Sequence, residues 1–108
     1  MARGLVRGEI RLCQFPSPDK ERPVVILTRN SVIDRLSNVT VAPVTSTIRG
    51  VDSEVFLDVS DGMKGPCAIN LHNIATVSRV HLGQTVAVLS PRKLQQVCGA
   101  MMYALGCL

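Results

Sequence analysis

Two stretches of the sequence place charged or hydroxyl side chains at the ends of apolar runs. Arg22 and Pro23 come directly before the apolar residues 24–27. Because proline fixes its own φ and disfavours helix at the residue before it, we expect Arg22 to be extended at the start of a strand. A second apolar run, 39–44, is followed by four polar side chains: Thr45, Ser46, Thr47 and Arg49. If these runs pair in a sheet, a cation and three hydroxyl groups meet at one end, which predicts a phosphate-binding pocket.

The excess positive charge of the chain lies in the half that contains this expected pocket. The 108 residues have a formal net charge of +4. Residues 1–50 carry eight basic and four acidic side chains, whereas residues 51–108 carry four of each. A polyanion or an acidic protein is therefore the kind of partner that the N-terminal half attracts.

Length and composition are typical of one small folded domain, residues 1–108. With 46% hydrophobic but only 3% aromatic residues, the core must rest on aliphatic side chains, methionine and cysteine. Residues 1–7 lack the hydrophobic segment of a signal peptide, and no apolar stretch reaches the roughly 18 residues of a membrane span. We therefore expect a soluble protein with no obvious export signal.

The cysteines favour reduced, structural thiols and a cytoplasmic location. The four of them are Cys13, Cys67, Cys98 and Cys107. They form no Cys-x-x-Cys pair and no zinc-like grouping with His72 or His81, so no metal site or other cofactor is expected. Neither histidine has a neighbouring pattern that marks a general acid or base, and both are interpreted as surface or interface residues.

The pattern of apolar residues predicts a mainly β body. Alternating or continuous apolar stretches bounded by turn residues indicate strands at 9–15, 23–28, 39–44, 54–59, 67–71, around 76–77 and at 85–89. The continuous run at 23–28 is typical of a strand covered on both faces. One short helical turn is expected over 31–36, with Ser31 as its cap. Met63 and Lys64 lie among turn residues and are interpreted as part of a turn.

The C-terminal residues predict an α-helix that closes the fold. Ser90 is an N-cap followed by Pro91, and apolar side chains then recur at helical spacing. Gly106 is the expected C-terminal cap, and Gly99 suggests close packing against a neighbour. Many short strands followed by one helix indicate a small barrel.

Several segments, taken in order, resemble the MazF/PemK family of bacterial toxin–antitoxin systems. In the first half these are Arg7-Gly8-Glu9-Ile10 and the runs 22–27 and 41–46. In the second half they are 70–77 and 89–94. The resemblance thus covers nearly the whole chain.

This resemblance implies a fold, an activity and a protein partner. The fold is a small SH3-like barrel of the CcdB/PemK type with a C-terminal helix, assembled as a homodimer. The activity is sequence-specific cleavage of single-stranded RNA, independent of the ribosome and of any metal. The partner is a cognate antitoxin, whose acidic, flexible tail occupies the RNA groove.

The resemblance also assigns roles to individual residues. Arg22 and Thr45 correspond to the catalytic pair, and the expected RNA-binding residues are Lys20, Glu21, Ser46, Thr47 and Arg49. Metal-free cleavage uses the 2′-hydroxyl of the RNA as nucleophile, so the protein must stabilise charge on the phosphate and move protons. The planar guanidinium suits the first task but is a poor base. Glu21 and Glu9 are candidates for the base by their nearness in sequence.

The chain also departs from the pattern of the family that it resembles. The loop 16–21 is short and lacks the glycine-rich Ser-Glu-Gln stretch of many family members, so the RNA sequence that is cut cannot be carried over. With only Phe15, Phe56 and Tyr103 as aromatics, few side chains can stack on bases. Base recognition is therefore expected from polar side chains and backbone groups.

Three other functions remain as alternatives. A gyrase poison of the CcdB type needs a tryptophan near its C-terminus, and this chain has none. A non-catalytic barrel that binds proline-rich peptides needs clustered aromatic residues, which are also missing. A family member that binds RNA without cutting it is the third possibility.

Overall fold

The computed structural model describes residues 4–16 and 21–107. Seven antiparallel strands make up the body: β1 (Glu9–Gln14), β2 (Glu21–Ile26), β3 (Asn38–Thr45), β4 (Glu54–Leu57), β5 (Cys67–Asn70), β6 (Ala75–Ser78) and β7 (Leu82–Val88). The α-helices are α1 (Asn30–Ile33) and α2 (Pro91–Ala104), and 3-10 turns cover Val59–Asp61, Leu71–Asn73 and Arg79–His81. The strand order is β4-β5-β3-β2-β1-β7, with β6 also paired to β3.

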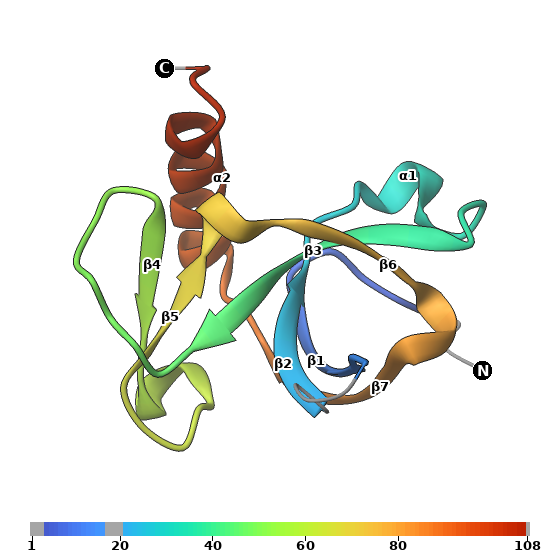
Figure 1. Ribbon diagram of the computed structural model, residues 1–108, viewed down its shortest axis with the longest axis horizontal. Coiled ribbons are helices and arrows are strands. Elements are labelled where there is room, and N and C mark those ends of the chain that lie inside the picture. Colours follow the sequence, from blue (N-terminus) through green and yellow to red (C-terminus); the bar gives the residue numbers. More distant parts are fainter. Residues whose placement is uncertain (1–3, 17–20, 108) are drawn as a thin grey trace.

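The long strand β3 bends the sheet into a half-barrel. One edge of β3 pairs with β2 over residues 41–43, and the other edge pairs with β6 over 38–41 and then with β5 over 44–45. The sheet therefore curves around β3, and α2 lies beside β4 and the turn after β5 (Figure 1). This architecture confirms the predicted mainly β, small-barrel fold with a C-terminal helix.

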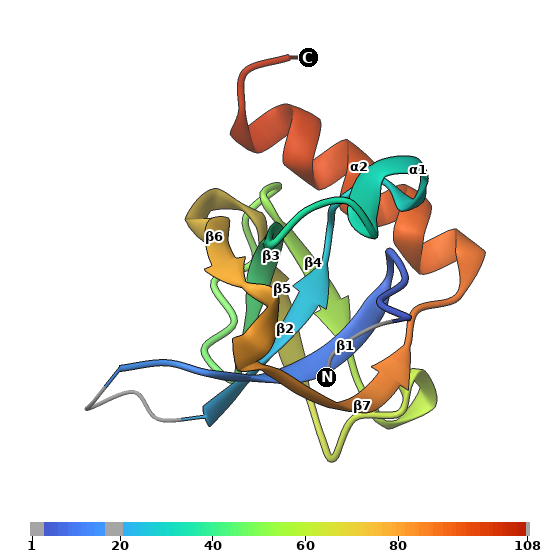
Figure 2. The same ribbon diagram turned by 90° about the vertical axis from the view of Figure 1, so that its right-hand side faces the viewer.

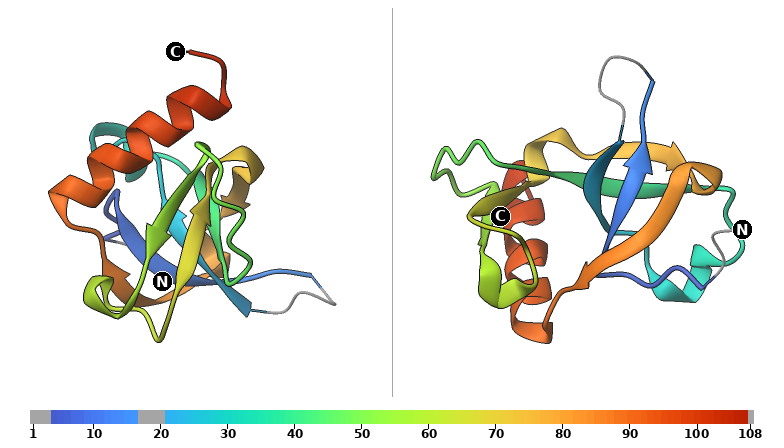
Figure 3. Two further views of the ribbon diagram at one scale, coloured as in Figure 1. Left: turned by 90° about the vertical axis from the view of Figure 1, so that its left-hand side faces the viewer. Right: turned by 90° about the horizontal axis from the view of Figure 1, so that it is seen from below.

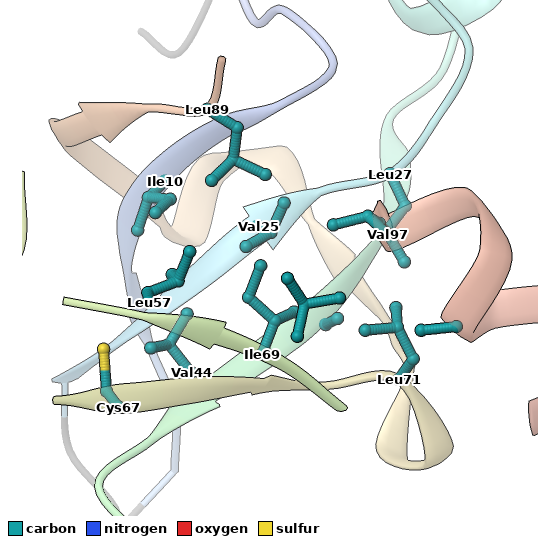
Figure 4. Close-up of a cluster of buried hydrophobic side chains, with 13 residues drawn as sticks. Ile10, Val25, Leu27, Val44, Leu57, Cys67, Ile69, Leu71, Leu89 and Val97 are labelled. Atoms are coloured by element: carbon teal, nitrogen blue, oxygen red, sulfur yellow. The ribbon is translucent and has the colours of Figure 1, made fainter. Parts of the chain in front are cut away.

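Strand β2 is buried on both faces, as its continuous apolar sequence predicts. Val25 belongs to a core cluster beneath α2, and Val24 belongs to a second cluster on the opposite face of the sheet. Both side chains are fully buried. The cluster beneath α2 joins β2 to β4, β5 and Val97 of the helix (Figure 4). Because both faces of β2 pack against apolar side chains, its two ends are held in fixed positions.

Helix α2 begins and ends as the sequence predicts. The Ser90 hydroxyl accepts a hydrogen bond from the Lys93 N–H at 3.1 Å, and Pro91 is the first helical residue. Gly106, with φ of 75°, follows the last turn in the left-handed conformation that favours glycine. Figure 2 shows α2 crossing the top of the sheet.

Two local predictions were wrong. Ser31 does not cap α1: the cap position is Arg29, and no side chain makes a capping hydrogen bond there. Gly99 does not mark close packing within the described chain, because a Cβ built on it meets nothing within 4 Å. Among the described residues, no helix is long and apolar enough to cross a membrane.

The strand ends differ from the predicted ones by two residues or more in three strands: β2, which spans residues 21–26 where 23–28 was predicted, β4 and β7. The strand predicted over 54–59 ends at Leu57, because Asp58 caps the 3-10 turn that follows. Strand β7 begins at Leu82, three residues before the predicted start, although its residues 83–86 are exposed. It does so because it pairs with β1 from Leu82 onward, with Cys13 opposite Leu82.

Candidate active site

A cavity of about 960 Å³ opens where β2 begins and β3 ends. The connection between β4 and β5, residues 58–66, bounds it on one side, and β1, β2 and β7 bound it on the other. In Figure 1 this connection is at the lower left and the start of β2 at the bottom of the view. Figure 3 shows the same segments from below. The cavity is lined by Glu21 and Arg22 from β2, by Thr45, Ser46 and Thr47, and by Gln84 and Thr85 from β7.

Arg22 lies at the start of β2, half-buried and opposite Cys13 of β1. It lines the large cavity and also a smaller one of about 140 Å³, which includes Phe15 and Asn73. Two ion pairs occur within residues 4–16 and 21–107, Arg11 with Glu9 and Lys93 with Asp61. The guanidinium of Arg22 has no carboxylate partner in this part of the chain, so its donors are available to a ligand.

Thr45 ends β3, and its hydroxyl is oriented by the loop that follows. Its Oγ1 accepts a hydrogen bond from the Thr47 N–H at 3.1 Å. Because the oxygen already serves as an acceptor there, the hydroxyl hydrogen can be donated into the cavity. The predicted pair, Arg22 and Thr45, therefore lines one cavity, as the sequence suggested.

The loop after β3 contributes its first residues to the cavity but not Arg49. Ser46 and Thr47 are exposed and line it. Arg49 does not line it; its N–H and that of Gly50 donate to the Glu54 carboxylate at 3.0 and 2.9 Å. The Arg49 side chain is exposed beyond this anchored turn. Lys20 lies outside the described residues.

The two carboxylates considered as a base differ in position. Glu9 does not line the cavity, and its carboxylate accepts hydrogen bonds from the Val6 N–H at 2.8 Å and the Thr85 hydroxyl at 3.2 Å. It also pairs with Arg11 at 3.1 Å. Glu9 is thus committed to holding β1 and β7 together. Glu21 lines the cavity and is the one acidic residue that does so among the described residues.

The histidines lie away from the cavity. His72 and His81 are both exposed, and neither lines it. The His72 Nδ1 is 2.5 Å from the hydroxyl of Ser53, a buried residue in the turn before β4. This contact fixes the turn after β5, so it agrees with a structural interpretation of His72.

Sequence reasoning missed one wall of the cavity, the connection between β4 and β5. Met63 and Lys64 were interpreted as turn residues, and they do lie in a turn, but both line the cavity. Cys67 lies beside them, and burial, followed by the charges of Asp61 and Asp58, raises the pKa of its thiol. The sequence shows Lys64 only as a lysine between two turn glycines, Gly62 and Gly65. That pattern does not show that the turn borders a cavity, which depends on the pairing of β4 with β5.

Comparisons with known proteins agree on a family. A family model described as "PemK-like, MazF-like toxin of type II toxin-antitoxin system" matches residues 6–105. The chain is 36% identical over 102 residues to the probable endoribonuclease MazF2 of Mycobacterium tuberculosis, covering 94% of this chain and 98% of that protein. It is 44% identical over 71 residues to endoribonuclease MazF3 of the same organism, covering 66% of this chain and 69% of that protein.

Solved structures have the same fold. Mycobacterium tuberculosis toxin MazF-mt6 superposes with a TM-score of 0.83 at 36% identity, over 91% of this chain and 96% of that one. A mycobacterial endoribonuclease solved in complex with its cognate antitoxin gives a TM-score of 0.87 at 24% identity, over 97% and 98% of the two chains. At that identity, the second likeness supports the fold alone.

Proposed function

The chain belongs to the MazF/PemK family of type II toxin–antitoxin endoribonucleases, and we propose that it cleaves single-stranded mRNA at short sequences, without a metal or the ribosome. The observation that carries this proposal is the shared cavity of Arg22 and Thr45. A cation and a hydroxyl donor on neighbouring strands can both reach one phosphate. The net positive charge of residues 1–50 favours approach of a polyanion to the same part of the chain.

The reaction that fits these side chains is attack by the neighbouring 2′-hydroxyl. Its oxygen forms a bond to phosphorus while the bond from phosphorus to the 5′-oxygen breaks. The leaving 5′-oxygen takes a proton from solvent water, so the products are a 2′,3′-cyclic phosphate and a free 5′-hydroxyl. The nucleophile belongs to the RNA, so the protein needs no serine or cysteine for this role.

Arg22 and Thr45 stabilise the charge that builds up on the phosphate oxygens. The guanidinium donates two parallel hydrogen bonds, and the Thr45 hydroxyl adds a third. Because Arg22 lacks a carboxylate partner among the described residues, it needs no rearrangement to bind phosphate. We propose Glu21 as the acceptor of the 2′-hydroxyl proton, a role supported by its being the one acidic residue of the described lining.

The residues around the catalytic pair bind the RNA. Ser46 and Thr47 line the cavity, and the exposed Arg49 extends the positive surface beyond it. Lys20, next to Glu21 in sequence, completes the proposed set. The polar side chains and backbone groups of these loops select the bases.

We further propose that the toxin is a homodimer inhibited by an acidic antitoxin. Met102 and Tyr103 of α2, and Leu105 directly after it, leave apolar surface exposed, and the space over Gly99 is open. A second copy of the chain would cover such a face.

An acidic antitoxin segment would compete with RNA for the Arg22 cavity. The four free cysteines agree with action in the reducing cytoplasm, where mRNA is found.

The direct test is cleavage of a long single-stranded RNA by the pure protein in excess EDTA. The wild type is expected to produce discrete fragments, whereas Arg22→Ala is expected to leave the RNA nearly intact. Arg35→Ala is the matched control, since Arg35 is exposed and does not line the cavity. Intact RNA with the wild type would remove the nuclease proposal. Equal cutting by the wild type and Arg22→Ala would remove Arg22 from the mechanism.

A further inference from the structure

We propose that Lys64 binds a second phosphate of the RNA, next to the one that is cleaved. This inference rests on the proposed nuclease function and extends it to the opposite wall of the cavity. Lys64 comes from the connection between β4 and β5, whereas Arg22 comes from β2. Two cations from separate elements therefore line one cavity.

The connection that carries Lys64 is held in one conformation by hydrogen bonds at its start. The Asp58 carboxylate accepts from the Ser60 N–H at 2.9 Å, and the Asp61 carboxylate accepts from the Asp58 N–H at 3.0 Å. The hydrogen bonds from Ser60 lower the pKa of Asp58, so this cap persists throughout the neutral range. The chain thus leads to Lys64 from a turn whose conformation is fixed by these hydrogen bonds.

Two further contacts tie this connection to the body of the protein. Lys93 of α2 donates to the Phe56 carbonyl at 2.6 Å and pairs with Asp61 at 3.7 Å. Gly62 has φ of 92°, and a Cβ built on it would lie 3.1 Å from the Ala87 Cβ of β7. Only glycine fits this contact without strain or displacement. Helix α2 and strand β7 therefore hold the wall in place.

The charge of Lys64 is available to a ligand. Arg11 of β1 and Lys93 of α2 are both paired with carboxylates. Within the described residues, Lys64 makes no hydrogen bond or ion pair through its side chain, and it is exposed. An exposed lysine contributes little to the stability of the fold. The role of Lys64 is therefore to bind a ligand that enters the cavity.

The size of the cavity and the chemistry of lysine suit a phosphate that does not react. A cavity of about 960 Å³ lies at the upper end of the usual range for ligand sites, so it has room for more than one phosphate group. An ammonium on a flexible stem acts as a point charge, whereas the planar guanidinium of Arg22 supplies paired donors. Lys64 therefore contributes to binding and register, and Arg22 to the chemical step.

The first experiment measures binding of an RNA with a 2′-deoxy nucleotide at the mapped cleavage site, so that it is not consumed. The dissociation constant is determined over a range of salt concentrations for the wild type and Lys64→Gln. Each phosphate contact in single-stranded RNA adds about −0.7 to the slope of log K against log salt. We expect Lys64→Gln to lower the magnitude of this slope by about 0.7. An unchanged slope would overturn the proposal.

The matched control is Arg35→Gln, which removes one positive charge from the opposite side of the molecule. Arg35 follows α1, at the upper right of Figure 1, and does not line the cavity. The Arg35→Gln variant is expected to keep the wild-type slope of log K against log salt. A fall equal to that of Lys64→Gln would show a general effect of net charge and would contradict a specific contact.

The second experiment places single methylphosphonate linkages along the same RNA, so that one phosphate at a time loses its charge. The wild type is expected to lose affinity at the linkage that Lys64 contacts, and Lys64→Gln is expected to be insensitive there. That linkage must differ from the cleaved one. Identical profiles for the two proteins, or a change confined to the cleaved linkage, would overturn the proposal.

Turnover separates this inference from the proposed nuclease function. In EDTA, Lys64→Gln is expected to raise KM with little change in kcat, because the contact is made equally in the ground and transition states. If the wild type does not cut RNA, no cleavage site can be mapped and the binding measurements use the unmodified RNA; a salt slope lowered by Lys64→Gln then supports the phosphate site although the nuclease function fails. A large loss of kcat in Lys64→Gln would instead make Lys64 part of the chemical step and contradict a purely binding role.

Discussion

Arg22 and Thr45 lie two residues beyond the last residues of β2 and β3 that pair with each other. The pairing of these strands runs from Ile26 opposite Val41 to Val24 opposite Pro43. Two further steps in this register would place Arg22 opposite Thr45. Pairing between β2 and β3 stops before that point, while the last residues of β3 still pair with β5 along the other edge. The separation of the strands leaves both side chains at the mouth of a cavity.

The parting of the strands has a local cause in the sequence. Pro23 lies just beyond the last residue of β2 that pairs with β3, at the position that would face Val44 if the β2–β3 ladder continued, and it has no N–H to donate there. Pro23 therefore disfavours further pairing at the place where the cavity opens.

Replacement of Arg22 by alanine is predicted to lower kcat by about 10²–10³-fold, the usual loss for one preorganised donor. Arg22→Lys keeps the charge but loses the paired donors, so we expect an intermediate rate. Arg22 is half-buried and has no carboxylate partner among the described residues, so the melting temperature should change little. The measurement is single-turnover cleavage in EDTA. A rate for Arg22→Lys equal to that of alanine would argue that charge alone contributes nothing.

Replacement of Thr45 by valine is predicted to lower kcat by roughly 10–150-fold, which corresponds to the 1.5–3 kcal/mol of a hydrogen bond to a charged group. Thr45→Ser keeps the hydroxyl that accepts from the Thr47 N–H and should retain most activity. The same cleavage assay, with thermal unfolding as a control, compares the two variants. Equal activity of serine and valine at this position would exclude the hydroxyl from catalysis.

The helix cap at Ser90 gives a test of stability that does not involve the site. Ser90→Ala removes the acceptor of the Lys93 N–H and is predicted to cost about 1 kcal/mol of the free energy of unfolding. Ser31→Ala is the matched control: the structure shows no capping bond from Ser31, so no similar loss is expected. Chemical denaturation measures both. Equal losses in the two variants would contradict the different roles of these serines.

The buried thiols predict a loss of stability at alkaline pH. Burial raises the pKa of Cys13 and of Cys67, and the carboxylates of Asp61 and Asp58 add to the effect at Cys67. Above about pH 8.5 the thiols ionise first in the unfolded chain, so the free energy of unfolding falls as the pH rises further. Below that pH the thiols are protonated in both states and their contribution is constant.

Alanine at both positions, Cys13→Ala with Cys67→Ala, is expected to make this alkaline decline shallower, whatever its effect on stability at pH 7. The measurement is urea denaturation at several pH values between 7 and 10. Cys107→Ala is the control, because Cys107 is exposed. Parallel curves for the wild type and the double variant would show that the buried thiols do not cause the decline.

The fold was predictable from the sequence wherever one local pattern decided the outcome. The continuous apolar run of β2 predicted burial on both faces, and the Ser90-Pro91 start predicted α2. The patterns failed where pairing overrode them. Strand β7 starts at Leu82 through its pairing with β1, although its following residues are exposed. Ser31 was misread because a serine before an apolar residue looks the same whether or not its hydroxyl caps a helix.

The site was predictable only in the part that lies on paired strands. Arg22 and Thr45 could be placed together because antiparallel pairing of two apolar runs brings their ends to one edge. Lys64 could not be assigned to the site from the sequence, because it lines the cavity only through the way in which the connection between β4 and β5 folds back. Glu9 was a candidate base by its nearness in sequence, which does not show that Arg11 and Thr85 already hold its carboxylate.

The most direct test of the mechanism is a single change in the RNA. The cleavage site is first mapped with the wild-type protein in EDTA, and the nucleotide whose 2′-hydroxyl attacks is then replaced by its 2′-deoxy form. We predict that cutting at this site stops while the RNA still binds, and that the unmodified RNA yields a 2′,3′-cyclic phosphate and a 5′-hydroxyl. Continued cutting at the 2′-deoxy site would contradict attack by the 2′-hydroxyl, and with it the roles given to Arg22 and Thr45.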